Sequence, residues 1–404
     1  MNQEIREFEE NDILPFDFPT SSPKIIKVIG VGGGGGNAVK NMFREGIHDV
    51  VFVVANTDQQ ALADSDVPIK LQLGRETTHG LGAGNDPEVA RRAAEESIED
   101  IKAQFKDETQ MVFVTAGMGG GTGTGAAPVI AKCAKDCGML TVGIVTIPFK
   151  FEQRNKIKQA LKGVREMSQN VDALLVTSNE KLVEIYPGES LATGFKHADE
   201  TLTTATKRIA ELITCRGIIN LDFHDVKKIL KDGGVAIMST GIARGENRVN
   251  QAFDAALKSP LLYNNDIFKS KKILFNIYQS NQADHHLMLD EMNEVRHFMD
   301  KFVDKNIEVI WGLAVDPNLT DEVKITVLAT GFGVESIPLL DDEETTDIEI
   351  ERIYGERANK KQLYLYDNMS DNDLENDALI DAIESSPTYL RNSVGLSEIK
   401  ALRA

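Results

Sequence analysis

Two glycine-rich segments contain the residues best suited to do chemistry in this sequence. The first runs from Gly30 to Asn37 and the second from Ala116 to Gly125. Each follows a short apolar run and precedes a segment with helical periodicity. Backbone without Cβ atoms can approach a phosphate closely, and the free amides at a helix N-terminus carry partial positive charge. The two segments therefore predict a pair of phosphate-binding loops.

The first segment by itself fits more than one function. Gly30, Gly32 and Gly35 satisfy the dinucleotide-binding pattern G-x-G-x-x-G. Asp58 follows the next apolar run, near the place where such folds hold the ribose of NAD. A dinucleotide-dependent oxidoreductase therefore stays open as an alternative, as does a tight strand-to-helix turn that binds no ligand.

The second segment favours a nucleoside triphosphate. A dinucleotide fold already holds its pyrophosphate with one loop, whereas a triphosphate carries more charge to surround. The sequence contains no G-x-x-x-x-G-K-[ST] pattern, which excludes a P-loop NTPase, and neither glycine segment contains a lysine. We therefore expect backbone amides, helix dipoles and Mg²⁺ to neutralise the phosphates, although no dedicated metal-binding residue is evident.

Both loops need a scaffold that places them at one edge of a sheet. Near-continuous apolar runs alternate with helical patterns from Lys24 to about Arg216, which is typical of a parallel sheet covered on both faces. The expected strands are Ile25–Ile29, Val50–Ala55, Met111–Thr115, Thr141–Val145 and Ala173–Thr177. The helices that follow the two glycine segments are expected at Ala38–Arg44 and from Ala126 onward.

A second, smaller α/β unit is expected after this sheet. Its expected strands are Val235–Met238, Lys272–Tyr278, Glu308–Ala314 and Lys324–Ala329, with a helix at Leu287–Phe302. The predicted fold is α/β, with an N-terminal Rossmann-like parallel-sheet domain, a long central helix, a smaller C-terminal α/β domain and a disordered acidic tail. The predicted boundaries are a flexible arm (1–23), a nucleotide-binding domain (24–195), the central helix (196–216), the C-terminal domain (217–333), an acidic linker (334–385) and a terminal peptide (386–404).

Composition restricts the partners and the compartment. A formal net charge of -19 repels nucleic-acid phosphates and anionic lipid, so neither is expected as a direct partner. Residues 335–404 hold 17 acidic and 7 basic residues with few large apolar ones, which predicts disorder there. The acidic N-terminus is unlike a signal peptide, and no apolar run is long enough to span a membrane. Cys133 and Cys137 are interpreted as buried free thiols of a cytosolic protein, because no second ligand pair lies at metal spacing.

The second glycine segment also resembles a known family. The run Gly119-Gly-Gly-Thr-Gly-Thr-Gly125, with Ala116-Gly-Met before it and Ala-Ala-Pro128 after it, is similar to the signature of the tubulin/FtsZ family. The resemblance extends from about Lys24 to Gly333. It implies a GTPase that binds GTP and GDP and polymerises head-to-tail into cytoskeletal filaments of the bacterial division ring, in the cytoplasm at mid-cell. The alternatives are the oxidoreductase described above and a non-filamentous GTPase of related fold.

The resemblance also assigns residues to the phosphates and the ribose. Ala83 and Gly84 would lie at the γ-phosphate, although a mobile surface loop is the simpler reading of this stretch. Glu152 and Lys156 would contact the ribose, although family members commonly carry arginine in place of Lys156, and a charged helix start is the alternative. The other implied contacts are Gly33, Gly34, Asn37, Asn56, Gly117, Gly119, Gly120, Gly121, Thr122, Gly123, Thr124, Gly125 and Asn179.

Two residues of the expected central helix are assigned to the base. The resemblance implies that Phe195 stacks on guanine and that Asp199 accepts hydrogen bonds from its ring N–H and amino group. A carboxylate only accepts hydrogen bonds, and guanine presents two donors there where adenine cannot, so this pair would select GTP over ATP. Simple core packing is the alternative for Phe195.

Asn220, Asp222 and Asp225 form the predicted catalytic group. By themselves, two aspartates three residues apart at a helix start are an N-cap and a first-turn acid, which stabilise any helix. The resemblance implies that this segment reaches into the nucleotide site of the next subunit, where its carboxylates polarise the attacking water. His224 stands where a small residue is usual, and its place at a subunit contact would make assembly sensitive to pH.

A short segment near the C-terminus is the predicted partner-binding peptide. Pro387, Tyr389, Leu390 and Arg391 resemble the conserved peptide through which family members bind membrane tethers and division regulators. Tyr389 and Leu390 would fill a groove on the partner, and Arg391 would meet an acid.

Overall fold

The computed structural model describes residues 24–47, 49–214, 217–258, 267–303 and 307–332, together with Ala378. The chain divides into two compact units, Met1–Glu349 and Ile350–Ala404, and every helix and strand named below belongs to the first. The predicted N-terminal arm, the predicted terminal peptide and the predicted acidic linker (Ala378 excepted) lie outside the described residues.

The N-terminal half builds the predicted parallel sheet. Its strands are β1 (Ile26–Val31), β2 (Val50–Asn56), β3 (Ile69–Gln72), β4 (Met111–Gly117), β5 (Leu140–Ile147) and β6 (Ala173–Ser178). They pair in the order β3-β2-β1-β4-β5-β6, and every pair is parallel. All residues of β1 and β5 are buried, as the continuous apolar runs predicted.

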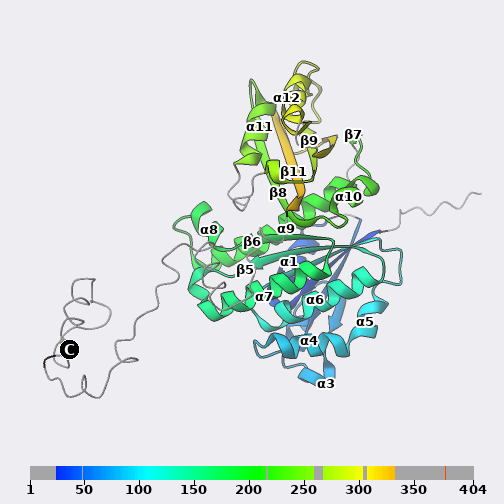
Figure 1. Cartoon of the computed structure of the whole chain (residues 1–404), viewed down its shortest axis with the longest axis vertical. Coiled ribbons are helices and arrows are strands. Elements are labelled where there is room, and N and C mark those ends of the chain that lie inside the picture. Colours follow the sequence, from blue (N-terminus) through cyan, green and yellow to red (C-terminus); the bar gives the residue numbers. More distant parts are fainter. Residues whose placement is uncertain are drawn as a thin grey trace, which may run out of the picture. The chain divides into compact units, whose positions relative to one another are not determined.

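Helices cover both faces of this sheet (Figure 1). Their bounds are α1 (Gly32–Arg44), α2 (Gln59–Ala63), α3 (Arg75–Thr78), α4 (Pro87–Glu96), α5 (Ile98–Ala103), α6 (Gly121–Asp136), α7 (Arg154–Asn170), α8 (Glu180–Ile185) and α9 (Leu191–Thr214), with the 3-10 turn η2 at Lys150–Glu152. Helices α4, α5, α6 and α7 pack together on one face, and α1 packs against α9 on the other. The long predicted helix is therefore α9, which begins at Leu191, five residues before its expected start.

The C-terminal strands continue the same sheet. They are β7 (Gly217–Ile219), β8 (Gly234–Arg244), β9 (Lys272–Gln279), β10 (Glu308–Val315) and β11 (Glu322–Phe332). Strand β8 pairs in parallel with β6, so the two predicted sheets form one sheet in the order β3-β2-β1-β4-β5-β6-β8-β11-β9-β10-β7. Helices α10 (Phe223–Leu230), α11 (Arg248–Leu257) and α12 (Met292–Val303) accompany these strands, as do the 3-10 turns η3 (Ile267–Lys269) and η4 (Ala283–His285).

Both helices that follow the glycine segments begin earlier than the sequence indicated. Helix α1 starts at Gly32 and α6 at Gly121, so the glycines form the first turns of the helices. A Cβ atom on Gly35 would lie 2.2 Å from the carbonyl oxygen of Thr115. The close packing of α1 on β4 therefore requires glycine at this position. Because glycine has a weak helix propensity, these residues were expected in a loop and not in a helix.

One arginine connects three segments of the C-terminal part. Arg248, at the start of α11, donates from Nε and Nη2 to the carboxylate of Glu291 at 2.7 and 3.0 Å. Its Nη1 also donates to the carbonyl oxygen of Asp321 at 3.1 Å. Burial is the largest single influence on Glu291 and opposes its ionisation, but the bond from Arg248, the bond from the Met288 amide and the charge of Arg248 together lower the pKa of Glu291 below its ordinary value. This pair ties the segment before α12 and the start of β11 to α11.

Replacing this arginine should destabilise the protein. Arg248→Met leaves a largely buried carboxylate without its cation, and we expect a loss of about 2–4 kcal/mol in the free energy of unfolding, measured by urea denaturation. Arg296→Met is the matched control, because Arg296 is exposed and lies 3.9 Å from Asp300. The control should change stability by less than about 0.5 kcal/mol. Equal urea midpoints for the two variants would contradict this role of Arg248.

Candidate functional site

Both glycine segments meet at the point where the strand order reverses. Strands β1 and β4 are neighbours, and their connections leave in opposite directions, to β2 and to β5. Ligands of open α/β sheets bind in the crevice at such a point, outside the carboxyl ends of the strands. The N-termini of α1 and α6 converge there, since a Cβ atom on Gly32 would lie 2.8 Å from the Gly123 nitrogen and one on Gly34 would lie 3.5 Å from Gly117 Cα.

The glycines of the two segments serve two purposes. A Cβ atom on Gly123 would lie 2.4 Å from the Gly117 carbonyl oxygen, and one on Gly125 would lie 2.0 Å from that of Pro87, so these two are required by packing. A Cβ atom on Gly33 or Gly36 would meet nothing within 4 Å. These two glycines therefore face open space, where a ligand could approach the backbone.

The first turns of α1 and α6 are suited to an anion. Neither first turn contains an acidic residue that would cancel the positive end of the helix dipole. The first four amides of a helix lack intrahelical partners, which for α6 means Gly121 to Thr124. Gly125 follows these four and packs closely against Pro87, and its contact with the nucleotide stays a prediction.

The two threonines of the second glycine segment make different contacts. Thr124 is buried, and its hydroxyl accepts a hydrogen bond from the Gly119 amide at 2.8 Å. The hydroxyl of Thr122 lies 2.7 Å from that of Thr57, which follows β2. Thr124 therefore shapes the loop, whereas Thr122 connects it to the neighbouring strand end. Sequence reasoning did not single out Thr57.

The segment from His79 to Asn85 packs against the second glycine segment. Its backbone is unusual, because His79, Gly80, Gly82, Gly84 and Asn85 all have positive φ angles. A Cβ atom on Gly121 would lie 3.1 Å from Ala83 Cβ, which places Ala83 beside the start of α6. Ala83 is buried, while Gly84 is exposed with open space around it. This places the two predicted γ-phosphate residues next to the amides of α6.

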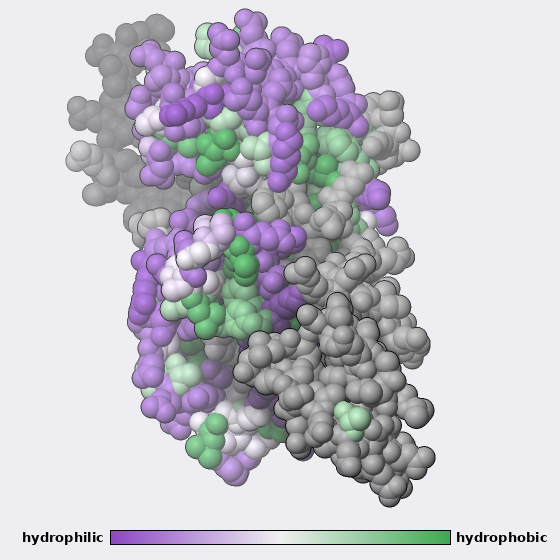
Figure 2. All heavy atoms as spheres, turned by 90° about the vertical axis from the view of Figure 1, so that its left-hand side faces the viewer, coloured by the Kyte–Doolittle hydropathy of each residue, from purple (hydrophilic) through white to green (hydrophobic). Residues whose placement is uncertain are grey.

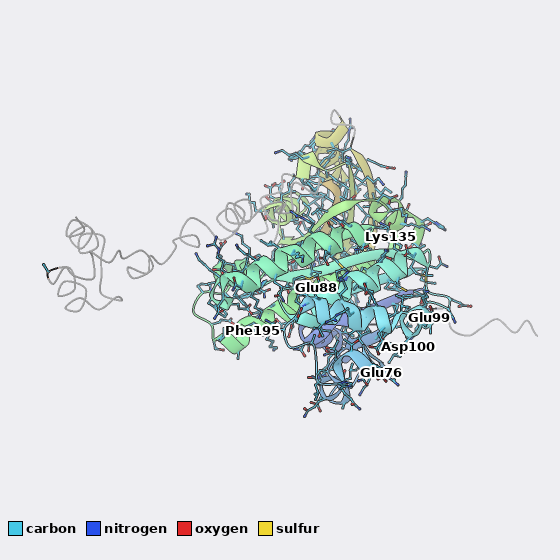
Figure 3. The ribbon with its side chains drawn as sticks, turned by 60° about the horizontal axis from the view of Figure 1, so that its bottom comes forward. Glu76, Glu88, Glu99, Asp100, Lys135 and Phe195 are labelled. Carbon is cyan, nitrogen blue, oxygen red and sulfur yellow. The ribbon has the colours of Figure 1, made fainter. Side chains whose placement is uncertain are left out.

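The predicted base-binding residues lie at the other end of the crevice. Asp199 on α9 shares a hydrogen bond with Asn37 on α1, and burial raises the pKa of Asp199 to about 6 in spite of that bond. Phe195 is 40% exposed, and its ring lies edge-on to Phe149 with the ring centroids 5.3 Å apart. Phe195 is thus a half-exposed aromatic face, which argues against simple core packing. Figure 3 shows Phe195 on the opposite side of the ribbon from Glu99 and Asp100.

Two further predicted residues lie at strand ends in this region. Asn179, after β6, is buried, and its Oδ1 atom makes no hydrogen bond. A buried unsatisfied acceptor is costly unless a ligand or water supplies a donor. Asn56, at the end of β2, is also buried and accepts a hydrogen bond from the Asp58 amide at 3.2 Å.

Glu152 and Lys156 are occupied with local contacts. Lys156 Nζ lies 2.5 Å from Glu152 Oε2, and Glu152 Oε1 accepts a hydrogen bond from the Phe149 amide at 2.9 Å. These contacts match a charged helix start, the simpler of the two interpretations. A ribose contact would have to share these two side chains with their existing partners.

The acid that suggested a dinucleotide enzyme has a structural role. Asp58 is the N-cap of α2, and its Oδ1 atom accepts hydrogen bonds from the amides of Gln60 and Ala61 at 2.8 and 3.2 Å. A carboxylate that satisfies two backbone amides is poorly placed to bind the ribose of NAD.

The predicted catalytic aspartates cap α10. Asp222 Oδ1 accepts a hydrogen bond from the Asp225 amide at 2.9 Å, and Asp225 Oδ2 accepts one from the Asp222 amide at 3.0 Å. Asn220 Oδ1 accepts one from the Gly217 amide at 2.6 Å. The helix-capping interpretation therefore holds for the isolated chain. Both carboxylates keep a second oxygen for another partner.

These aspartates lie far from the glycine segments of their own chain. Lys231, at the end of α10, pairs at 2.8 Å with Asp172, which directly precedes β6. Lys207, in the second half of α9, pairs at 3.0 Å with Glu45, at the end of α1. Helix α10 therefore lies at the amino ends of the parallel strands, roughly 20 Å from their carboxyl ends, because a strand rises about 3.3 Å per residue. Figure 1 shows α10 well separated from α3 and α4.

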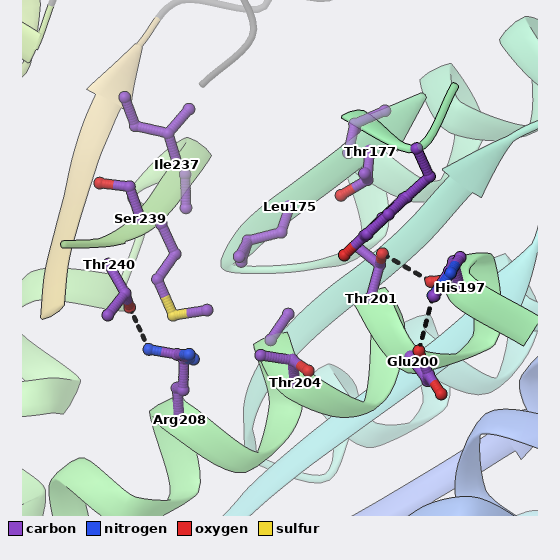
Figure 4. Close-up of a pocket in the computed structure, with 15 residues that line it drawn as sticks. Leu175, Thr177, His197, Glu200, Thr201, Thr204, Arg208, Ile237, Ser239 and Thr240 are labelled. Atoms are coloured by element: carbon purple, nitrogen blue, oxygen red, sulfur yellow. Dashed lines mark hydrogen bonds and ion pairs between the residues drawn. The ribbon is translucent and has the colours of Figure 1, made fainter. Parts of the chain in front are cut away.

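A separate cleft lies between α9, β6 and β8 (Figure 4). It has a volume of about 280 Å³, and no residue predicted from the sequence to form a site lines it. At one end, His197 lies between Glu200 and Glu189, at 2.8 and 2.9 Å, and the bond with Glu200 leads in raising the pKa of His197. At the other end, Arg208 donates to the hydroxyl of Thr240.

Two of the cysteines lie among the described residues. Cys133 is buried, and burial raises the pKa of its thiol to about 11, but Cys137 is exposed, which corrects the expectation for that residue. Within the described ranges, no group of three His, Cys, Asp or Glu residues could hold a metal ion. No helix in the same ranges is long and apolar enough to cross a membrane.

Comparison with known proteins agrees with this geometry. The model of the Tubulin/FtsZ family GTPase domain matches residues 25–187, that of the FtsZ family C-terminal domain matches 234–333, and a further model of the FtsZ C-terminus matches 359–404. The chain is 50% identical over 421 residues to the cell division protein FtsZ of Porphyromonas gingivalis, covering 98% of this chain and 91% of that protein. It is 41% identical over 380 residues to the protein of the same name from Wigglesworthia glossinidia brevipalpis, covering 92% and 97%.

A solved structure of an empty FtsZ dimer from M. jannaschii is also similar. Its TM-score is 0.70 at 41% sequence identity, and the match covers 77% of this chain and 88% of that one. The chain therefore belongs to the tubulin/FtsZ family, in its FtsZ group, and carries the GTPase domain of that family.

Proposed function

We propose that this GTPase hydrolyses GTP at a site that a second copy of the chain completes. Repetition of this contact would build head-to-tail filaments of the bacterial division ring in the cytoplasm. Two relatives at 50% and 41% identity are named cell division proteins. The observation that carries the proposal is the separation within one chain of the glycine segments from Asp222 and Asp225. An intramolecular site would need both at one edge of the sheet.

The nucleotide half of the site would lie over the carboxyl ends of β1 and β4. The free amides at the starts of α1 and α6 would hold the phosphates, and the open space above Gly33 and Gly36 admits them. Guanine would stack on Phe195 and donate to Asp199, and Asn179 Oδ1 would gain the partner that it lacks. GDP would use the same residues apart from those at the γ-phosphate.

The catalytic half would come from the next chain. Its Asp222 and Asp225 would approach the γ-phosphate with the carboxylate oxygens that the capping bonds leave free, and would take a proton from the attacking water. Asn220 would help to orient that water. The described residues offer no metal cage of their own, so Mg²⁺ would be held mainly by phosphate oxygens and water, as is usual for this ion.

Exposed apolar side chains near the proposed base-binding residues and near the proposed catalytic segment support a head-to-tail contact. Leu191 and Phe151, near the base-binding end, are 60% and 56% exposed. Ile218 and Ile219, in β7 just before the catalytic segment, are also exposed. A contact between two different surfaces of one chain repeats without closing and gives a filament. Figure 2 shows the face that carries α8, where the coloured surface is largely hydrophilic with small separate hydrophobic patches.

Partners would bind outside the described residues. Pro387, Tyr389, Leu390 and Arg391 fall within the range 359–404 that the FtsZ C-terminus model matches. We propose that membrane tethers and division regulators bind this peptide and that nucleic acid does not bind the chain. Loss of the γ-phosphate would weaken the filament, because the segment around Ala83 and Gly84 would lose the ligand that orders it.

The shared site predicts a specific effect of Asp225→Asn. Asparagine can still accept the hydrogen bond from Asp222, so α10 should stay capped, but it cannot take a proton. We expect GTP binding within about twofold of the parent and a loss of about 100-fold or more in GTP turnover. Phosphate release and nucleotide binding would be measured on the same preparation.

Asp232→Asn is the matched control for that experiment. Asp232 is an exposed aspartate just after α10 with φ of 51°, a conformation that asparagine tolerates well. The control should turn over GTP like the parent. If Asp225→Asn did so too, the assignment of the catalytic acid would be wrong.

The raised pKa of Asp199 predicts a dependence of GTP affinity on pH. Only the ionised carboxylate accepts both hydrogen bonds from guanine. Because the pKa of Asp199 is about 6, its carboxyl group must lose a proton before it can bind guanine below pH 6. Affinity should therefore be constant above about pH 7 and fall roughly tenfold by pH 5. Titration of a fluorescent GTP analogue at each pH would measure this.

Asp199→Asn is the variant that tests the cause. It should bind GTP more weakly at pH 7 and should lack the tenfold fall toward pH 5. Because burial raises the pKa of Asp199 in the folded state, ionisation costs folding free energy that grows above pH 4 and levels off above pH 6. The empty Asp199→Asn protein should therefore be no less stable than the parent at pH 7. An unchanged pH profile in the variant would contradict the assignment.

A further inference from the structure

Gln159 on α7 holds two loops of the proposed nucleotide site together. Its single amide nitrogen lies 3.0 Å from the Gly120 carbonyl oxygen, 3.2 Å from that of Gly119 and 3.3 Å from that of Asn85. Gly119 and Gly120 belong to the second glycine segment, whereas Asn85 ends the segment that carries Ala83 and Gly84. One side chain thus donates to both loops.

The packing of α7 fixes this side chain. Gly163, one helical turn after Gln159, lies against the first turn of α6, and a Cβ atom there would be 2.4 Å from Thr124 Cγ2. Helix α7 therefore cannot move away from α6 without losing this close approach. Gln159 is also partly buried, which limits competition from water for its two N–H groups.

Thr57 makes a second hydrogen-bonded connection between the same two loops. Thr57 contacts the Thr122 hydroxyl at 2.7 Å, and its carbonyl oxygen accepts a hydrogen bond from the Gly82 amide at 3.3 Å. The segment from Gly80 to Asn85 is therefore connected to the second glycine segment through Thr57 near its middle and through Gln159 at its end. In this segment Gly80, Gly82 and Gly84 adopt positive φ angles at little cost, and Asn85, which Gln159 contacts, has a φ of 64° that residues with a side chain adopt less readily.

We propose that Gln159 is a positioning residue that holds the γ-phosphate part of the site in its binding geometry, and that it thereby sets the preference for GTP over GDP. This proposal rests on the proposed function, because it places the γ-phosphate beside Ala83 and Gly84. GDP has no group that reaches the tied segment, so loosening it should leave GDP binding almost unchanged. A merely structural glutamine would affect both nucleotides alike, or would lower stability.

The test compares two nucleotides on full-length protein. Gln159→Met keeps the length of the side chain and removes both donors. Affinities for GDP and for guanosine 5′-[β,γ-imido]triphosphate would be measured by competition with fluorescent GDP, below the concentration at which the protein assembles. We expect a 5- to 10-fold loss of affinity for the triphosphate and less than a twofold change for GDP. This corresponds to about one net hydrogen bond.

Two further variants make the result decisive. Gln159→Glu should lose still more triphosphate affinity, because its charge repels the γ-phosphate, and it serves if the methionine variant fails to fold. Gln169→Met is the matched control, since Gln169 is exposed on the same helix. Equal losses for both nucleotides, a lowered melting temperature with unchanged selectivity, or no change at all would each overturn the proposal. A parent protein that binds neither nucleotide would instead overturn the proposed function.

Discussion

The close approach of two helix N-termini over one sheet edge is the constraint on which the rest of the structure depends. Helix α1 can approach α6 this closely only because Gly32 lacks a side chain, and Gly35 and Gly123 allow the two helices to pack closely on β4. That approach concentrates unpaired amides and two helix dipoles at the point where the strand order reverses. A single glycine loop would hold a pyrophosphate, whereas this arrangement is suited to the greater charge of a triphosphate without a lysine.

The same architecture separates binding from catalysis. Helix α9 has 24 residues, and at about 1.5 Å per residue it runs some 36 Å, from the base-binding end of the crevice to the amino ends of the strands. The catalytic segment follows its far end. Under the proposed function, a chain built this way would bind nucleotide at one end and carry its catalytic acids at the other, so hydrolysis would depend on assembly. The raised pKa of Asp199 is consistent with the proposed binding of guanine, because burial of the ionised carboxylate costs stability and guanine would supply two hydrogen-bond donors to it.

Much of the fold could be predicted from the sequence, for reasons that particular strands show. The strands β1, β4 and β5 are buried on both faces, and their apolar runs are therefore continuous and easy to recognise. Strand β3 was missed because only one of its four residues is buried, and β7 because it has three residues, two of them exposed. The early starts of α1 and α6 were missed because the need for glycine there comes from contacts with distant strands.

In the candidate site, too, short motifs were visible in the sequence, whereas contacts between distant residues were not. Motifs near in sequence, such as the glycine segments and the pair of aspartates, were recognised, although only their long-range packing shows which glycines face open space. Gln159 carried no signal, because its contacts are with residues 39, 40 and 74 positions away. Thr57 was passed over for the same reason, since Thr122 lies 65 positions away.

In the proposed shared site, one chain binds the phosphates and the aspartates of another chain take a proton from the water that attacks them. The most direct test of this arrangement mixes two inactive chains, Asp225→Asn and Gly33→Glu, the second placing a charge in open space where the phosphates would lie. In an equal mixture, about a quarter of head-to-tail contacts would join an intact nucleotide half to an intact pair of aspartates, so GTP turnover should recover to about that fraction of the parent rate. A mixture as inactive as its two components would contradict the shared site.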